Sequence, residues 1–99
     1  MTFEERVRRA LDELPPHLAR ALENVAVVVE EEAPGDPHLF GLWESHEYLP
    51  DKITIFRKPL VGSFPDPQEL EEEIRITVLH ELAHYFGIDE DRLDELGYS

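Results

Sequence analysis

The chain has 99 residues, 41% of them hydrophobic, which is enough for one modest core and predicts a single domain over residues 1–99. Its 23 acidic and 9 basic residues give a formal net charge of −14 at pH 7, which argues against nucleic acid as a partner because phosphates would be repelled. The chain has no cysteine, which excludes disulfides and thiolate ligands, and no apolar run suited to a signal peptide or a membrane span, so we expect a cytoplasmic protein with no membrane partner.

The N-terminal part of the chain predicts two helices. Thr2 and Glu5 form a capping box, and the apolar residues that follow recur at helical spacing. Pro15 and Pro16 end this first helix, and Pro16 suits the first position of a second, short one. The apolar residues of the two helices are Phe3, Val7, Ala10, Leu11 and Leu14, then Leu18, Ala21 and Leu22.

The middle of the chain predicts a small three-stranded sheet. Residues 25–30 are so rich in β-branched side chains that they indicate a strand. A second strand is expected over 38–43, where Gly41 lets another backbone come close, and a third over 53–57. Residues 59–67 are expected to form a loop. Together these elements predict an α+β domain in which one sheet packs against the helices.

A long helix is predicted from Pro67 to Phe86, because both its ends are marked in the sequence. Asp66 and Glu69 form a capping box around Pro67, and Gly87 suits the left-handed residue that follows a helix. Two neighbouring apolar stripes run along the helix, so its second half should be buried. The stripes are Leu70, Ile74, Val78 and Leu82, and Ile76, Leu79, Ala83 and Phe86.

This helix carries the motif His80-Glu81-Leu82-Ala83-His84 near its end. Residues four apart lie on one helical face, so the imidazoles of His80 and His84 can reach one Zn²⁺ ion. Glu81 stands beside the first ligand, where its carboxylate can take a proton from the attacking water and later return it to the leaving group. The plain alternative is a solvated helix with two coincidental histidines.

A catalytic zinc site normally has three protein ligands, so a third must be found. In a His-Glu-x-x-His-x-x-Gly-x-x-ligand pattern the last position is Glu90, which makes it the first candidate. Asp89 and Asp91 are alternatives in the same turn, although Asp89 also suits the N-cap of a short helical stretch that follows. All three acids can equally be a solvated helix start.

The chain resembles the small bacterial zincin-like metallopeptidases described as having a matrix-metalloprotease-like domain. The resemblance rests on the segment from His80 to Glu90, on Arg92 to Tyr98, and more weakly on Leu49 to Arg57. It implies a zincin-like α+β fold, with His80 and His84 as ligands, Glu81 as the base and an acid at Glu90 as the third ligand. The chain departs from true metzincins, which have a methionine turn after the motif, because its one methionine is Met1.

Two functions from different classes fit these features. The first is a zinc-dependent metallopeptidase that hydrolyses a peptide or protein substrate. The alternative is a non-proteolytic zinc-binding module that docks a partner through a sheet edge near Phe40–Trp43, a segment that can also be plain core packing. Zinc hydrolysis of another kind of bond is less favoured, because the sequence has no phosphate-binding loop.

The sequence does not select the side chain that would stabilise an oxyanion. The available donors are His46, Tyr48, Tyr85 and Tyr98. His17 and His38 are expected at the surface or in loops, and His46 can also approach the metal from a loop.

Overall fold

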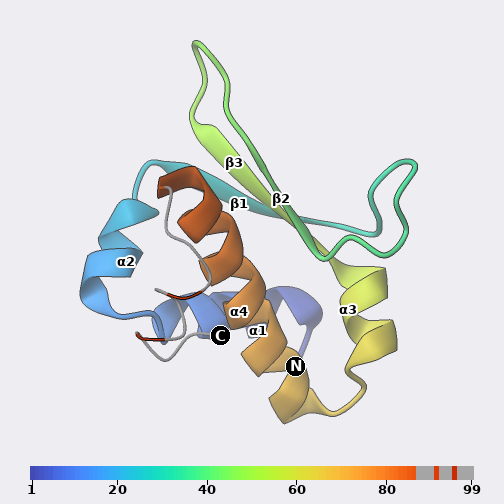
Figure 1. The fold of residues 1–99 in the computed structure, drawn as a ribbon. Helices are drawn as coiled ribbons and strands as arrows, with labels where there is room; N and C mark the ends of the chain where they lie inside the picture. The colour runs from blue at the N-terminus through green and yellow to red at the C-terminus, as the bar shows by residue number, and fades with distance from the viewer. Residues whose placement is uncertain (87–90, 92–94, 96–99) are drawn as a thin grey trace.

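The computed structural model describes residues 1–86, 91 and 95. The elements follow one another as two helices, three strands and two helices (Figure 1). Their bounds are α1 Phe3–Asp12, α2 Pro16–Ala21, β1 Val25–Glu30, β2 Gly41–Glu44, β3 Asp51–Phe56, α3 Arg57–Ser63 and α4 Pro67–Phe86. The predicted combination of a three-stranded sheet with helices is confirmed. No helix in the described part of the chain is long and apolar enough to cross a membrane.

The sheet has the strand order β1-β3-β2, with β3 in the middle. β1 pairs with β3 in parallel, from Val25 opposite Asp51 to Glu30 opposite Phe56. β2 pairs with β3 in antiparallel fashion, from Gly41 opposite Ile55 to Glu44 opposite Lys52. β2 is therefore an edge strand, as a docking edge requires.

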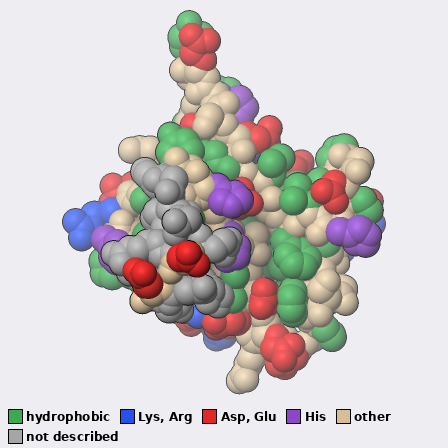
Figure 2. All heavy atoms as spheres, viewed as in Figure 1, with side chains coloured by type: hydrophobic (Ala, Val, Ile, Leu, Met, Phe, Trp, Pro, Cys, Tyr) green, Lys and Arg blue, Asp and Glu red, His purple; other side chains and the backbone are tan. Residues whose placement is uncertain are grey.

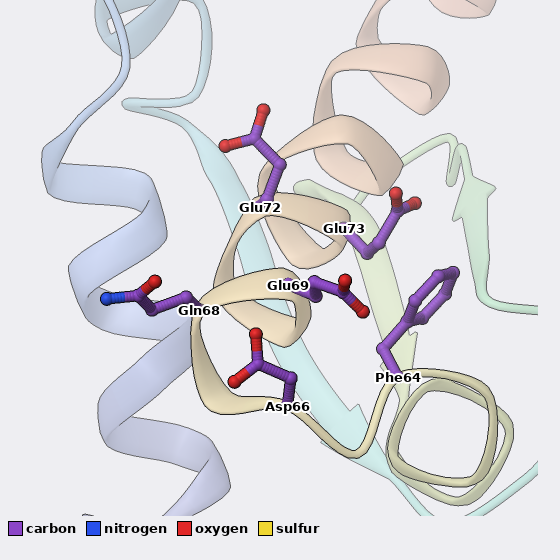
Figure 3. A pocket seen from close by; sticks show the side chains of 6 residues that line it. All are labelled: Phe64, Asp66, Gln68, Glu69, Glu72 and Glu73. Atoms are coloured by element: carbon purple, nitrogen blue, oxygen red, sulfur yellow. The ribbon is translucent and has the colours of Figure 1, made fainter.

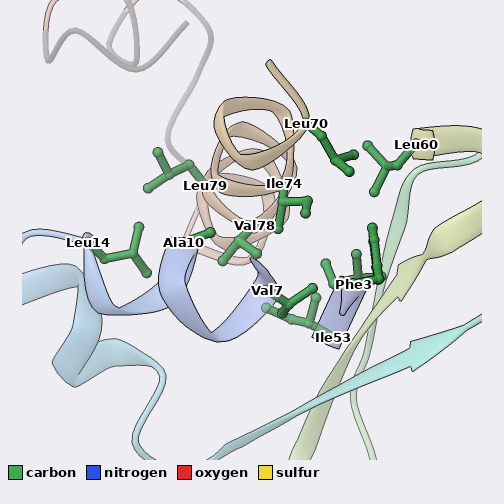
Figure 4. Close-up of a cluster of buried hydrophobic side chains, with 11 residues drawn as sticks. Phe3, Val7, Ala10, Leu14, Ile53, Leu60, Leu70, Ile74, Val78 and Leu79 are labelled. Carbon is green, nitrogen blue, oxygen red and sulfur yellow. The ribbon is translucent and has the colours of Figure 1, made fainter. Parts of the chain in front are cut away.

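The hydrophobic core lies between one face of this sheet and the helices α1 and α4 (Figure 4). α1 contributes one stripe, with Val7 and Ala10 almost fully buried. β3 contributes Ile53 and Ile55, and α3 contributes Leu60, all of them completely buried. The other face of the sheet is more open, since Leu42 is 39% exposed there.

Ion pairs tie the outer surfaces of these elements together. Arg6 and Arg9 of α1 both reach the Glu71 carboxylate of α4, at 3.3 and 3.4 Å. The Arg57 guanidinium donates two hydrogen bonds to Glu31, with Nε–Oε1 at 2.8 Å and Nη2–Oε2 at 2.6 Å. The first set joins the two long helices, and the second joins α3 to the segment after β1.

The predicted helix from Pro67 to Phe86 is confirmed as α4. Its first apolar stripe is buried throughout, with Ile74 and Val78 at 0% exposure. The second stripe is less uniform, because Leu79 and Ala83 are buried but Ile76 is half-buried. Thr2 and Glu5 form the predicted capping box of α1, in which the Glu5 amide donates to Thr2 Oγ1 at 3.1 Å.

Two predictions in the middle of the chain need correction. The strand expected over 38–43 begins at Gly41 and runs to Glu44, because its length is set by pairing with β3, where Glu44 meets Lys52 at 3.5 Å. The strand expected over 53–57 is displaced in the opposite direction and spans Asp51–Phe56, since Lys52 pairs with Glu44 at the end of β2.

The expected loop after β3 is also wrong in its first part, since Arg57–Ser63 forms the short helix α3. Pro59 is compatible with this helix because it falls in the first turn, where the backbone N–H has no intrahelical partner. The side chain of Leu60 is fully buried and anchors the helix to the core.

Candidate functional site

α4 carries the His80-Glu81-Leu82-Ala83-His84 motif in its last two turns. Leu82 and Ala83 are buried against the core, so the other three side chains are left on the outer side of the helix. His80 and Glu81 are half-buried and His84 is exposed. Figure 2 shows histidine side chains gathered near the middle of the face over α4. The packing of α4 thus directs His84 to the surface, whereas the Nε2 atom of His80 is buried.

The Glu81 carboxylate is held by the edge strand. The backbone N–H of Trp43 donates a hydrogen bond to Glu81 Oε2, with N and O 3.1 Å apart. On this strand Phe40 already bonds to β3, because its carbonyl accepts from the Phe56 amide at 2.9 Å. Since hydrogen-bonded pairs alternate in an antiparallel ladder, the backbone groups of Gly41 and Trp43 face away from β3. Glu81 therefore lies at the free edge of β2.

The surroundings of Glu81 change its acidity. Burial raises the pKa of the Glu81 carboxyl above its ordinary value of 4.5. The imidazole of His84, the hydrogen bond from Trp43 and the imidazole of His80 act in the opposite direction and lower this pKa. A carboxyl group with a raised pKa is better matched to proton transfer near neutral pH.

A glycine allows α4 to approach the edge strand this closely. A β-carbon on Gly41 would lie 2.7 Å from Thr77 Cγ2 and 3.4 Å from the carbonyl oxygen of Thr54. The same position is 3.6 Å from Glu81 Cγ. Gly41 was predicted to permit a close backbone approach, and the neighbour that comes close is α4.

Two cavities adjoin β2, one at Gly41 and one at Trp43. The smaller has a volume of about 270 Å³, and Glu81 and His80 line it together with Phe40, Gly41, Thr77, His38 and Leu39. The larger, of about 400 Å³, lies towards the end of α4 and is lined by Trp43, Tyr85, Asp51, Leu49, Pro50, Ala21, Asn24 and Val25. The β2 edge thus passes from one cavity to the other.

The larger cavity has an aromatic wall and a carboxylate. The rings of Trp43 and Tyr85 are stacked, with centroids 4.4 Å apart and an interplanar angle of 17°. Trp43 Nε1 donates to Asp51 Oδ2 at 3.3 Å. The Tyr85 hydroxyl bonds to the same carboxylate, and this hydrogen bond raises the pKa of Tyr85. The sequence analysis missed this group, because its members come from three elements far apart along the chain.

The predicted third ligand lies outside the described residues, as do Asp89, Gly87 and Tyr98. Asp91 is described and is exposed. Among residues 1–86, 91 and 95, no three His, Asp or Glu side chains lie close enough together to hold a metal ion. The described residues therefore supply an incomplete donor set, and Glu90 is left as the residue expected to complete it.

The donor types that are present fit zinc. His80 and His84 present two imidazoles on one side of α4, and imidazole nitrogen is a preferred zinc ligand. Glu81 lies beside them with its carboxylate held at the rim of the cavity. Imidazole and carboxylate groups of this kind are donors that proteins commonly offer to zinc.

The remaining sequence candidates are dispersed. His46 and Tyr48 are exposed in the turn between β2 and β3, and Tyr48 is 90% exposed. His17 is exposed on α2, as expected. His38 is an exposed residue of the segment before β2, but it also lines the smaller cavity together with His80.

A further cavity, of about 570 Å³, lies at the opposite end of α4 (Figure 3). Phe64 and Gln68 line it together with four acidic residues, Asp66, Glu69, Glu72 and Glu73. It is remote along the helix from the motif residues. Its carboxylates add to the negative charge of the molecule without joining the histidine site.

Comparison with known proteins identifies the family of the chain. A family model described as zincin-like metallopeptidase matches residues 22–98, and thus covers the sheet, α3 and the motif helix. A search among curated proteins gave no match. The resemblance seen in the motif is confirmed by the family model, and the chain belongs to the zincin-like metallopeptidase family.

Proposed function

We propose that this protein is a zinc-dependent metallopeptidase whose site lies where the end of α4 meets the free edge of β2. The observation that carries the proposal is the position of Glu81, beside two histidines and hydrogen-bonded to the edge strand. His80 and His84 would hold Zn²⁺, with Glu90 as the third ligand. When bound, the ion supplies Lewis acidity for a water nucleophile and for the scissile carbonyl.

Glu81 is proposed as the general base. Its carboxylate takes the proton of the attacking water and then delivers that proton to the leaving amine. The Trp43 amide holds Oε2 in place, which leaves Oε1 to accept the proton. Burial supports this role, because it raises the pKa of Glu81 towards the working range of a base.

The edge strand is proposed to align the substrate. The backbone groups of Gly41 and the carbonyl of Trp43 face away from β3, so an extended peptide can pair with them, while the Trp43 N–H stays bonded to Glu81. Both cavities lie on the side of β2 that faces α4, so they are available to those side chains of the peptide that point to this face.

The test combines metal content with turnover. The wild-type protein, purified without chelators or a histidine tag, is expected to hold about one zinc per chain and to cleave members of a peptide library. Glu81→Gln should keep the zinc and lose cleavage by at least about 100-fold, since general catalysis contributes factors of this order. His84→Ala should lose both.

Other results would change the assignment. A Glu81→Gln variant that cleaves at the wild-type rate would remove Glu81 as the base. Zinc binding without any cleavage would favour the alternative of a non-proteolytic zinc-binding module, and failure to bind zinc would contradict both functions.

A further inference from the structure

The cavity of Trp43, Tyr85 and Asp51 stands out from the rest of the surface, because it is built from side chains that are fixed by one another. The Trp43 and Tyr85 rings are stacked at 4.4 Å, and both donate hydrogen bonds to Asp51. A volume of about 400 Å³ falls in the range of ligand pockets. Leu49 and Pro50 close one side of it. The cavity is thus large enough to hold one long side chain.

This cavity lies next to the proposed site, because residues of β2 and α4 belong to both or are neighbours in sequence. The backbone N–H of Trp43 donates a hydrogen bond to Glu81, and the Trp43 side chain lines the cavity. Tyr85 directly follows His84 at the end of α4. Because Trp43 contacts Glu81 and Tyr85 follows His84, the cavity lies next to the proposed site, within reach of one long side chain of a substrate held there.

The charge of the cavity selects the class of side chain. Asp51 receives two hydrogen bonds, but a carboxylate has about four lone-pair sites, so acceptor capacity remains. Lys52, its neighbour in sequence, pairs with Glu44 on the opposite face of the sheet, because successive strand residues point to opposite sides. Among the described residues no Lys or Arg lines this cavity.

An aromatic wall beside a carboxylate is complementary to an organic cation. The faces of Trp and Tyr attract ammonium and guanidinium groups, and the aliphatic stems of Lys and Arg pack on Leu and Pro. The net charge of −14 adds a long-range attraction for the same ligands. We propose that the Trp43–Tyr85–Asp51 cavity is a specificity subsite that takes an arginine or lysine side chain of the peptide substrate, an inference that rests on the proposed peptidase function.

Binding can be measured without turnover. Trp43 is the single tryptophan of the chain, so its fluorescence reports directly on the cavity. The zinc-loaded Glu81→Gln variant is titrated with peptides that are identical except at one position, which is Arg, Lys, Leu or Glu. The Arg and Lys peptides should bind roughly tenfold more tightly than the Leu peptide, and the difference should shrink as salt is added.

Three substitutions in the same background locate the effect. Asp51→Asn keeps an acceptor for Trp43 Nε1 but removes the charge, so the Arg-to-Leu preference should fall to about one. Tyr85→Phe keeps the stacked ring and frees an acceptor of Asp51, so the preference should persist. Asp12→Asn removes an exposed charge at the end of α1 and should leave the preference unchanged. Equal binding of the Arg and Leu peptides, or an unchanged preference in Asp51→Asn, would overturn the subsite.

A cleavage screen with the wild-type protein separates this inference from the proposed function. Cleavage enriched for peptides with one basic residue at a fixed distance from the cut supports both. Cleavage without that enrichment keeps the peptidase and overturns the subsite. Tight, charge-dependent binding of basic peptides without any cleavage contradicts the peptidase, and leaves a binding pocket that is not a substrate subsite.

Discussion

The backbone amide of Trp43 and the carboxylate of Glu81 are 3.1 Å apart, and they join residues separated by 38 positions in the sequence. Through this hydrogen bond the edge strand is attached to the motif helix at the residue proposed to act as the base. The bond also fixes the orientation of the carboxylate before any substrate arrives.

Removing the acceptor should expose the Trp43 amide to hydrogen exchange. Glu81→Ala leaves this amide without its side-chain acceptor, whereas Glu81→Gln retains a carbonyl oxygen at the same place. A hydrogen bond to a charged group contributes about 1.5–3 kcal/mol, so exchange of the Trp43 amide should be at least about tenfold faster in Glu81→Ala. Amide exchange followed by NMR tests this, and equal protection in Glu81→Ala and wild type would show that the bond is not formed in solution.

Gly41→Ala should destabilise the protein. The added methyl would lie 2.7 Å from Thr77 Cγ2, so α4 must move away from β2, at a cost of about 1–3 kcal/mol in the free energy of unfolding. Thr77→Ser removes that methyl group and keeps the hydroxyl, which donates to the Glu73 carbonyl oxygen at 2.8 Å. The double variant should therefore recover most of the loss in chemical denaturation, and a purely additive double variant would contradict the proposed clash.

The ion pair between Glu31 and Arg57 should make stability depend on pH. The hydrogen bonds from Arg57 lower the pKa of Glu31 below its ordinary value of 4.5. A group with a depressed folded-state pKa stabilises the fold at pH values above its unfolded pKa, and this contribution is lost as the pH falls through the folded pKa. Glu31→Gln should remove this part of the acid dependence in thermal melts between pH 7 and pH 3. The effect is small, because the pair is solvent-exposed. A Glu31→Gln melt series parallel to that of wild type would show that the pair contributes nothing.

Zinc should stabilise the folded chain. A ligand present at 100 times its Kd adds about 2.7 kcal/mol to the free energy of unfolding, which for a domain of this size raises the Tm by roughly 10 °C or more. A chelator should reverse the shift in wild type and in Glu81→Gln alike. His84→Ala should melt at the same temperature with and without zinc, and a zinc-dependent shift in that variant would place the metal elsewhere.

Sequence reasoning recovered those parts of the fold that depend on neighbouring residues. The capping box of Thr2 and Glu5, the strand at Val25–Glu30 and the start of the long helix at Pro67 are all specified by local patterns. α3 was missed because Pro59 and Gly62 are typical of loops, although the first turn of a helix accepts proline.

The site was only partly predictable for the same reason. The positions of His80, Glu81 and His84 on one helix follow from their spacing. The contact of Glu81 with Trp43 and the stack of Trp43 on Tyr85 depend on the register between β2 and β3 and on how α4 crosses them. No local pattern encodes that crossing, since it results from the packing of the whole core.

The core of the protein includes a helix, α1, that lies outside the segment matched by the family model. The family match begins at residue 22, beyond α1, yet α1 buries Phe3, Val7 and Ala10 against the core. A fragment limited to the matched residues would expose the apolar faces of α4 and the sheet to water, and such surfaces promote aggregation. The segment that identifies the family therefore covers only part of the packed core.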